Sequence, residues 1–161
     1  MSNYLALRVA RVIEETADAS SVVFDVPAHL GELFSYKPGQ FLTLRVPFEG
    51  GWLPRCYSLS STPLLDEPLR VTIKRVHQGR ASNWLCSELQ VGQTIDVLPP
   101  AGVFVPRNLD GDLLLFGGGS GVTPRRHPRR RQRLLAVRQR QHRSKVRQNP
   151  QQRLGWPGIP G

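Results

Sequence analysis

Cysteine is scarce in this chain, and long apolar runs are absent. The only two cysteines among 161 residues, Cys56 and Cys86, form no C-x-x-C pair, so neither a zinc site nor a disulfide framework is indicated. No stretch approaches the ~20 apolar residues of a membrane helix, and the N-terminus has no signal-peptide run. Because reduced cysteines suit a reducing compartment, we expect a cytoplasmic protein with no membrane contact.

Acidic residues are missing altogether from residues 125–161. Residues 1–124 hold 10 of the 22 Lys and Arg and all 12 Asp and Glu, a net charge of −2. The remaining 12 cations give the last 37 residues a charge of +12. Arg, Gln and Pro dominate this tail, and its residues follow neither the period of a strand nor that of a helix. A segment of this composition cannot bury enough apolar surface to offset the conformational entropy that it would lose on folding. We therefore expect residues 125–161 to be disordered.

The first hundred residues are typical of a β protein. Apolar residues in short runs between Gly- and Pro-containing turns predict an antiparallel barrel or sandwich. One segment, 79–89, instead has apolar residues at helical spacing, and we expect its Trp84 and Leu85 to pack mainly in the core. The predicted strands cover residues 4–14, 21–26, 40–46, 55–60, 69–76 and 94–98, the last ending before Pro99-Pro100.

A different kind of strand is predicted at residues 112–116. Its continuous apolar run is typical of a strand buried on both faces, and it leads into the glycine-rich segment 117–124. A buried strand entering a glycine-rich loop is how a nucleotide-binding α/β domain begins. After Pro124 the expected helix is replaced by four Arg in six residues, with Pro128 among them. Only the beginning of such a domain is therefore expected.

Arg55, Tyr57 and Ser58 form the first group of candidate site residues, on a predicted strand. An aromatic ring can lie on a planar heterocycle, a guanidinium can pair with phosphate, and a hydroxyl can meet a ring nitrogen. Strand alternation places Arg55 and Tyr57 on one face and Ser58 on the other. By itself the same pattern also fits an ordinary edge strand.

Two further groups carry backbone groups suited to phosphate. Gly79, Arg80, Ala81 and Ser82 begin the predicted helix, whose N-terminal N–H groups and dipole attract anions. Ser82 fits either a helix cap or a phosphate contact. In the segment 117–124, glycines permit close approach to a nucleotide and Thr123 adds a hydroxyl.

The order and spacing of these groups resemble the ferredoxin–NADP⁺ reductase superfamily. Gly-x-x-Ser follows Arg-x-Tyr-Ser by 24 residues, and GGGSGVTP follows 38 residues later. The likeness covers roughly residues 4–124, including a Lys37-Pro38-Gly39-Gln40-Phe41 turn and a Pro99–Phe104 segment, PPAGVF. The run VTIKRVHQGRASNWLCSELQVGQTIDVLPPAGVF looks most like reductase components of bacterial oxygenases of the ketosteroid 9α-hydroxylase and phenylacetyl-CoA epoxidase type.

This resemblance implies a mainly β fold in three parts. Residues 1–107 would form a six-stranded antiparallel Greek-key flavin barrel with one helix. Residues 108–124 would be the first strand and glycine loop of an incomplete NAD(P)-binding domain, and 125–161 a basic tail.

The resemblance also implies roles for single residues. Arg55 would bind the flavin diphosphate, Tyr57 would pack on the ribityl chain and isoalloxazine, and Ser58 would approach the N5 edge. Gly79, Arg80, Ala81 and Ser82 would hold the diphosphate, which implies FAD rather than FMN. Lys74, Arg75 and Val76 would line the flavin, and Thr123 would reach the junction of nicotinamide and flavin.

In the intact family, electrons pass from NAD(P)H through FAD to an iron–sulfur centre that serves an oxygenase or ferredoxin partner. The plant-type C-x₄-C-x₂-C spacing is absent here, so no iron–sulfur cluster is expected in this chain. A nicotinamide domain would need roughly 100 more residues, so we expect no working NAD(P)H site.

The abrupt change after Pro124 leaves alternatives open. One hypothesis is a reading-frame shift near Thr123–Pro124, giving a non-functional truncated product. A second is a free-standing flavin domain with an irrelevant tail. The third is a binding module whose tail holds nucleic acid or an anionic surface. Nucleic acid is disfavoured because the tail's one aromatic residue, Trp156, is far from the Arg cluster.

Overall fold

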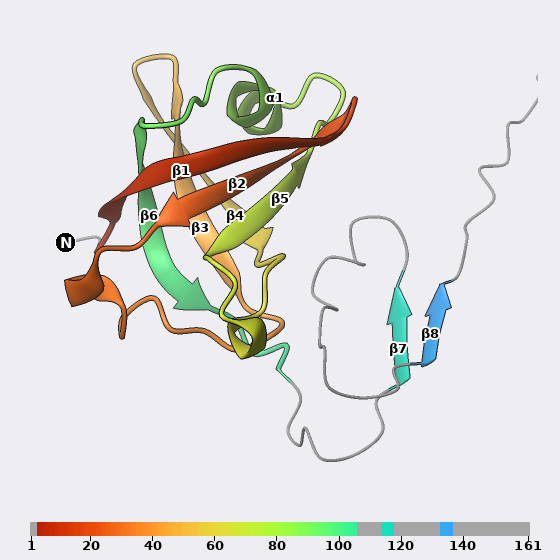
Figure 1. The fold of residues 1–161 in the computed structure, drawn as a ribbon. Helices are drawn as coiled ribbons and strands as arrows, with labels where there is room; N and C mark the ends of the chain where they lie inside the picture. Colours follow the sequence, from red (N-terminus) through yellow and green to blue (C-terminus); the bar gives the residue numbers. More distant parts are fainter. Residues whose placement is uncertain (1–2, 106–113, 118–132, 137–161) are drawn as a thin grey trace, which may run out of the picture.

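The computed structural model describes residues 3–105, 114–117 and 133–136. Within 3–105, six antiparallel strands form one sheet in the order β4-β3-β6-β1-β2-β5. One α-helix, α1 (Arg80–Ser87), lies across one end of the strands (Figure 1). The strands are β1 (Leu5–Thr16), β2 (Ala19–Asp25), β3 (Phe41–Phe48), β4 (Gly51–Ser58), β5 (Arg70–Lys74) and β6 (Thr94–Ala101), with 3₁₀ turns at Ala28–Leu30 and Pro63–Leu65.

The two outer strands of the sheet meet and close it into a barrel. Leu59, just after β4, forms a β-bridge with Val71 of β5. Beside it the Ser60 N–H donates to the Arg70 carbonyl oxygen at 2.8 Å. The two sheet edges are joined only at this point, so the barrel is partly closed. The predicted mainly β, six-stranded antiparallel barrel with one helix is therefore confirmed.

A single apolar core fills the barrel. Alternate residues of β3, namely Leu42, Leu44 and Val46, are fully buried, as period-two alternation requires of a strand with one interior face. Helix α1 closes this core with Ala81 and Leu85, and Leu89 follows just after it. Because these three residues lie four apart in sequence, they occupy one side of the helical segment. Trp84 also packs against the core and is partly buried.

A tight hairpin joins β3 to β4, where the sequence had predicted strands ending at residue 46 and resuming at residue 55. Phe48 pairs with Gly51, so only Glu49 and Gly50 form the loop. Both have positive φ, 43° and 74°, which is the type I′ geometry that matches strand twist. Pro47 and Pro54 obscured the strands in the sequence. The structure accommodates Pro54 because β4 pairs through this stretch only with β3.

The prediction that the last barrel strand ends before Pro99-Pro100 was wrong, since β6 continues through both prolines to Ala101. Pairing with β1 covers β6 only as far as Val97. Beyond that point β6 pairs with β3 alone, and the register shifts between Phe41 and Thr43. A strand with a free side and an irregular register can hold residues that lack an N–H.

Two short strands are described beyond residue 105. The predicted strand at 112–116 is seen as β7 (Leu114–Gly117). It pairs in parallel with β8 (Arg133–Ala136), inside the tail for which no regular element was predicted. The expectation of disorder for residues 125–161 stays a prediction, and the rest of the tail lies outside the described residues.

The C-terminal end of α1 is tied to β5 through Arg75, the residue after that strand. Its guanidinium donates to the Ser87 hydroxyl at 2.8 Å and to the Cys86 carbonyl oxygen at 2.9 Å. A cation at the C-terminus of a helix also satisfies carbonyl groups that have no partner within the helix. Within the described residues, no helix has the length and apolarity needed to cross a bilayer.

We predict that Arg75→Ala lowers the free energy of unfolding by about 1–2 kcal/mol, because two charge-assisted hydrogen bonds to α1 are lost. The adjacent Lys74→Ala is the matched control. Lys74 forms a 3.2 Å ion pair with Asp18, but both side chains are more than half exposed, so little or no loss of stability is expected. Urea unfolding of both variants, followed by circular dichroism, measures the difference. Equal losses would show that Arg75 does not anchor the helix.

Candidate functional site

The barrel is open between β4 and β5 on the side of α1. The backbone pairing described between these two edges consists of the Leu59–Val71 bridge and the neighbouring Ser60–Arg70 hydrogen bond, and side chains of Ser60 and Ser61 add hydrogen bonds to β5 at the same place. From there β4 runs back to Arg55, β5 runs on to Arg75, and α1 begins five residues later. The candidate residues of β4 and those that begin α1 therefore lie on two sides of this opening.

Tyr57 is the residue of β4 that reaches toward α1. Its ring is half-buried and packs against the core beside Cys86. Burial raises the pKa of the Tyr57 hydroxyl, the nearby Cys86 raises it further, and Arg55 acts in the opposite direction. The phenol is therefore neutral at pH 7 and keeps a proton to donate.

Arg55 and Ser58 flank Tyr57 with groups that the fold leaves available. Arg55 is exposed, and within the described residues its one hydrogen bond goes to the Pro54 carbonyl oxygen at 2.8 Å. It pairs with the buried Leu44 across the hairpin, so it shares the inward-facing side of β4 with Tyr57. Ser58, at the end of β4, is half-buried opposite Phe41.

Of the three residues predicted to line the flavin at the end of β5, Val76 is the one with an exposed apolar side chain. Its side chain is 61% exposed beside the start of α1. The side chain of Lys74 is instead paired with Asp18, and that of Arg75 is hydrogen-bonded to the end of α1. Contacts of Lys74 and Arg75 with a flavin stay predictions.

A close turn between Val76 and Ser82 shapes the N-terminus of α1. The Val76 N–H donates to the Ser82 hydroxyl oxygen at 3.1 Å, and the Gly79 N–H donates to the Val76 carbonyl oxygen at 2.8 Å. A Cβ atom on Gly79 would lie 2.5 Å from the Ser82 Oγ and 3.0 Å from the Val76 carbonyl oxygen. Glycine is therefore required here by space.

This turn leaves the first N–H groups of α1 uncapped. Gly79 is the N-cap, and among the described residues no side chain caps the first turn. Ser82 is buried and accepts from Val76, so its own hydroxyl proton remains free to donate. The N–H groups of Arg80, Ala81 and Ser82, together with that hydroxyl, form a set of donors suited to a phosphate.

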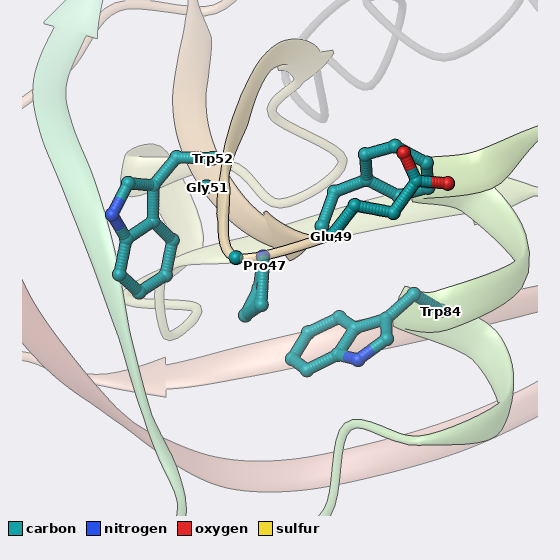
Figure 2. A pocket seen from close by; sticks show the side chains of 7 residues that line it. Pro47, Glu49, Gly51, Trp52 and Trp84 are labelled. Atoms are coloured by element: carbon teal, nitrogen blue, oxygen red, sulfur yellow. The ribbon is translucent and has the colours of Figure 1, made fainter.

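The structure adds an aromatic pocket that the sequence did not indicate. It has a volume of about 550 Å³ and is lined by residues 47–52 of the β3–β4 hairpin and by Trp84 of α1. Figure 2 shows Trp52 and Trp84 on two sides of the space below Pro47. The signal that could have found it is the Glu49-Gly50 turn between aromatic residues. Thr123 lies outside the described residues.

The comparisons with known proteins agree with this barrel. The family model of the oxidoreductase FAD-binding domain matches residues 6–105. The ferredoxin reductase component of 3-ketosteroid-9-alpha-monooxygenase from Rhodococcus rhodochrous is 56% identical over 124 residues, covering 76% of this chain and 35% of that protein. One of the subunits of 1,2-phenylacetyl-CoA epoxidase from Escherichia coli K12 is 37% identical over 127 residues, covering 77% and 35%.

Solved structures show the same likeness. Phthalate dioxygenase reductase, described as a modular structure for electron transfer from pyridine nucleotides to [2Fe-2S], aligns with a TM-score of 0.65 at 26% identity, over 76% of this chain and 37% of its own. The ferredoxin reductase in carbazole 1,9a-dioxygenase aligns with a TM-score of 0.61 at 30% identity, over 76% and 37%. The chain spans about a third of the length of its curated relatives. It belongs to the family of oxidoreductase FAD-binding domains of the ferredoxin–NADP⁺ reductase superfamily.

Proposed function

We propose that residues 1–107 bind FAD and that this unit carries electrons in the reductase component of an oxygenase system. The observation that supports this most directly is the opening between β4 and β5. An aromatic ring and an exposed guanidinium stand on one side of it, and uncapped helix N–H groups stand on the other. The family match covers nearly all of this unit.

The residues present fit the chemistry of a flavin diphosphate. Arg55 would pair with phosphate, and the N–H groups of Arg80, Ala81 and Ser82 would hold its oxygens at the positive end of α1. Tyr57 would pack on the ribityl chain and the ring system, Ser58 would face the ring edge, and Val76 would cover apolar ring surface. The Ser82 hydroxyl would donate its remaining proton to the diphosphate.

FAD itself supplies the acceptance of a hydride and the release of single electrons. The contribution of these residues is to orient the ring and to balance the charge of the diphosphate. By analogy with the relatives, the electrons would come from NAD(P)H and pass through an iron–sulfur centre to an oxygenase. Residues 108–124 would begin the nicotinamide-binding part, and the parallel pairing of β7 with β8 is compatible with such a start. No observation on the described residues favours the alternative of a polyanion-binding module.

Replacement of Arg55 by Ala is expected to weaken FAD binding by about 1.5–3 kcal/mol, more than tenfold, because a charge-assisted phosphate contact is lost. The exposed Arg11 of β1 provides a matched control, since Arg11→Ala removes the same charge away from the opening. Fluorescence titration of the purified chain with FAD measures both affinities. An unaltered affinity in the Arg55 variant would contradict the assignment, and no uptake of FAD by the native chain would refute the function.

Replacement of Gly79 by Ala should also weaken FAD binding, by about tenfold or more, because the new Cβ displaces Ser82 and distorts the helix start. The control is Gly31→Ala, where the backbone is helical and the nearest atom to a Cβ is the Ala28 carbonyl oxygen at 3.2 Å. Both variants are titrated with FAD after circular dichroism has established that they fold. Equal affinities for the two would remove Gly79 from the diphosphate site.

A further inference from the structure

A second pocket lies between the β1–β2 hairpin and the C-terminal end of α1. It has a volume of about 320 Å³, and its polar lining includes Glu14, Thr16, Ser20 and Arg75. The tip of the hairpin lies beside the end of β5, where the Arg75 N–H donates to the Asp18 carbonyl oxygen at 2.7 Å (Figure 1). Small-molecule sites have volumes of about 300–1,000 Å³, so this pocket is large enough for a small ligand.

One wall of the pocket carries a buried hydroxyl that has no partner. Ser20 is only 7% exposed, and within residues 3–105 its hydroxyl forms no hydrogen bond. The hydroxyl of the adjacent Ser21, in contrast, is hydrogen-bonded to Glu15 and to Thr72, each at 2.7 Å. Because buried polar groups are normally hydrogen-bonded, the Ser20 hydroxyl indicates that a polar group is held in the pocket.

The two charged residues of the lining have opposite signs and stand on different walls. Glu14 lies opposite Ser20 in the register of β1 and β2, and its exposed carboxylate has no ion pair or hydrogen bond within residues 3–105. Arg75 follows β5 and donates one N–H to the Ser87 hydroxyl and another to the Cys86 carbonyl oxygen. Since a guanidinium has five N–H donors, Arg75 keeps donors for a ligand.

This combination of groups matches a small molecule that carries both charges. A carboxylate can accept hydrogen bonds from Arg75 and from the Ser20 hydroxyl, and an ammonium group can donate to Glu14. Thr16 donates its own proton to Asp18 at 2.8 Å, so its hydroxyl oxygen is an additional acceptor for the ammonium group. A ligand with a single charge would leave either Glu14 or Arg75 unmatched.

We propose that this pocket binds a free α-amino acid with a short aliphatic side chain. Its carboxylate lies at Arg75 and Ser20, and its ammonium group lies at Glu14. Val12 and Ala17 complete the lining and leave space for a small apolar side chain. The proposal goes beyond flavin binding and does not depend on it.

Calorimetric titration of the full chain with L-alanine tests the site, with propionate and ethylamine as probes that each lack one of the two charges. L-Alanine is expected to bind with a Kd of about 1 mM or tighter. Each single-charge probe is expected to bind at least about tenfold more weakly, because it makes contacts on one wall only. Equal affinities for L-alanine and either probe, or no binding of L-alanine, would overturn the proposal.

Two variants locate the site. Ser20→Ala and Glu14→Gln each remove one contact and are expected to weaken L-alanine binding by about fivefold or more. Glu32→Gln removes the same charge at an exposed residue outside the lining, so its affinity is expected to stay within about twofold of the native chain. Arg75 is left unaltered because it also anchors α1.

Circular dichroism establishes that each variant folds before it is titrated. If Ser20→Ala does not fold, Glu14→Gln decides alone, since an exposed carboxylate without a partner contributes little to the fold. A native affinity in the Glu14 variant, or equal losses in the Glu14 and Glu32 variants, would show that L-alanine binds elsewhere and would overturn the site.

Discussion

The hydrogen bond from the Val76 N–H to the Ser82 hydroxyl oxygen fixes where α1 begins relative to β5. It forms only because residue 79 has no side chain, since a Cβ there would meet Ser82 and the Val76 carbonyl oxygen. The contact turns the chain sharply after β5 and starts α1 at the opening of the barrel. As a result, the core takes up one side of the helix, and its first N–H groups remain uncapped.

The two ends of α1 are held by different means, and this has a functional consequence. At the C-terminal end, Arg75 supplies the cation that the helix dipole favours and ties the last turn to β5. At the N-terminal end no side chain acts as a cap, although capping commonly contributes about 1 kcal/mol to stability. The fold thus leaves unsatisfied donors at the N-terminal end of α1. A bound diphosphate would satisfy them, so we expect cofactor binding and stability to be linked.

The barrel has an opening because its two outer strands are joined at one point only. The outer strands β4 and β5 join at Leu59 and Val71 and are not paired further along, so Tyr57, which pairs with Leu42 of β3, has Cys86 of α1 beside it instead of a residue of β5. The type I′ turn at Glu49-Gly50 extends β3 and β4 beyond the core. The aromatic residues around that turn are therefore carried past the barrel to a position beside α1.

The sequence by itself determined the class of the fold and the residues of the candidate site. Period-two alternation in Leu42, Leu44 and Val46 identifies a strand with one interior face, and the order of Arg-x-Tyr-Ser and Gly-x-x-Ser indicates the family. Local patterns could do this because alternation and glycine requirements are properties of neighbouring residues. Local patterns gave wrong strand bounds at the prolines in β3, β4 and β6. A strand can hold a proline where no neighbouring strand needs the N–H that proline lacks, and the sequence does not show where that is so.

Only the tertiary structure decided what each side chain near the opening does. Arg75 is next to Lys74 in sequence, yet it binds α1 while Lys74 pairs with an exposed carboxylate, because the register of β2 and β5 brings different partners to each. Trp52 and Trp84 have no relation in the sequence, and they line one pocket because a hairpin and a helix meet at the same end of the barrel. Contacts between residues distant in the chain follow from strand order and closure, which no local pattern encodes.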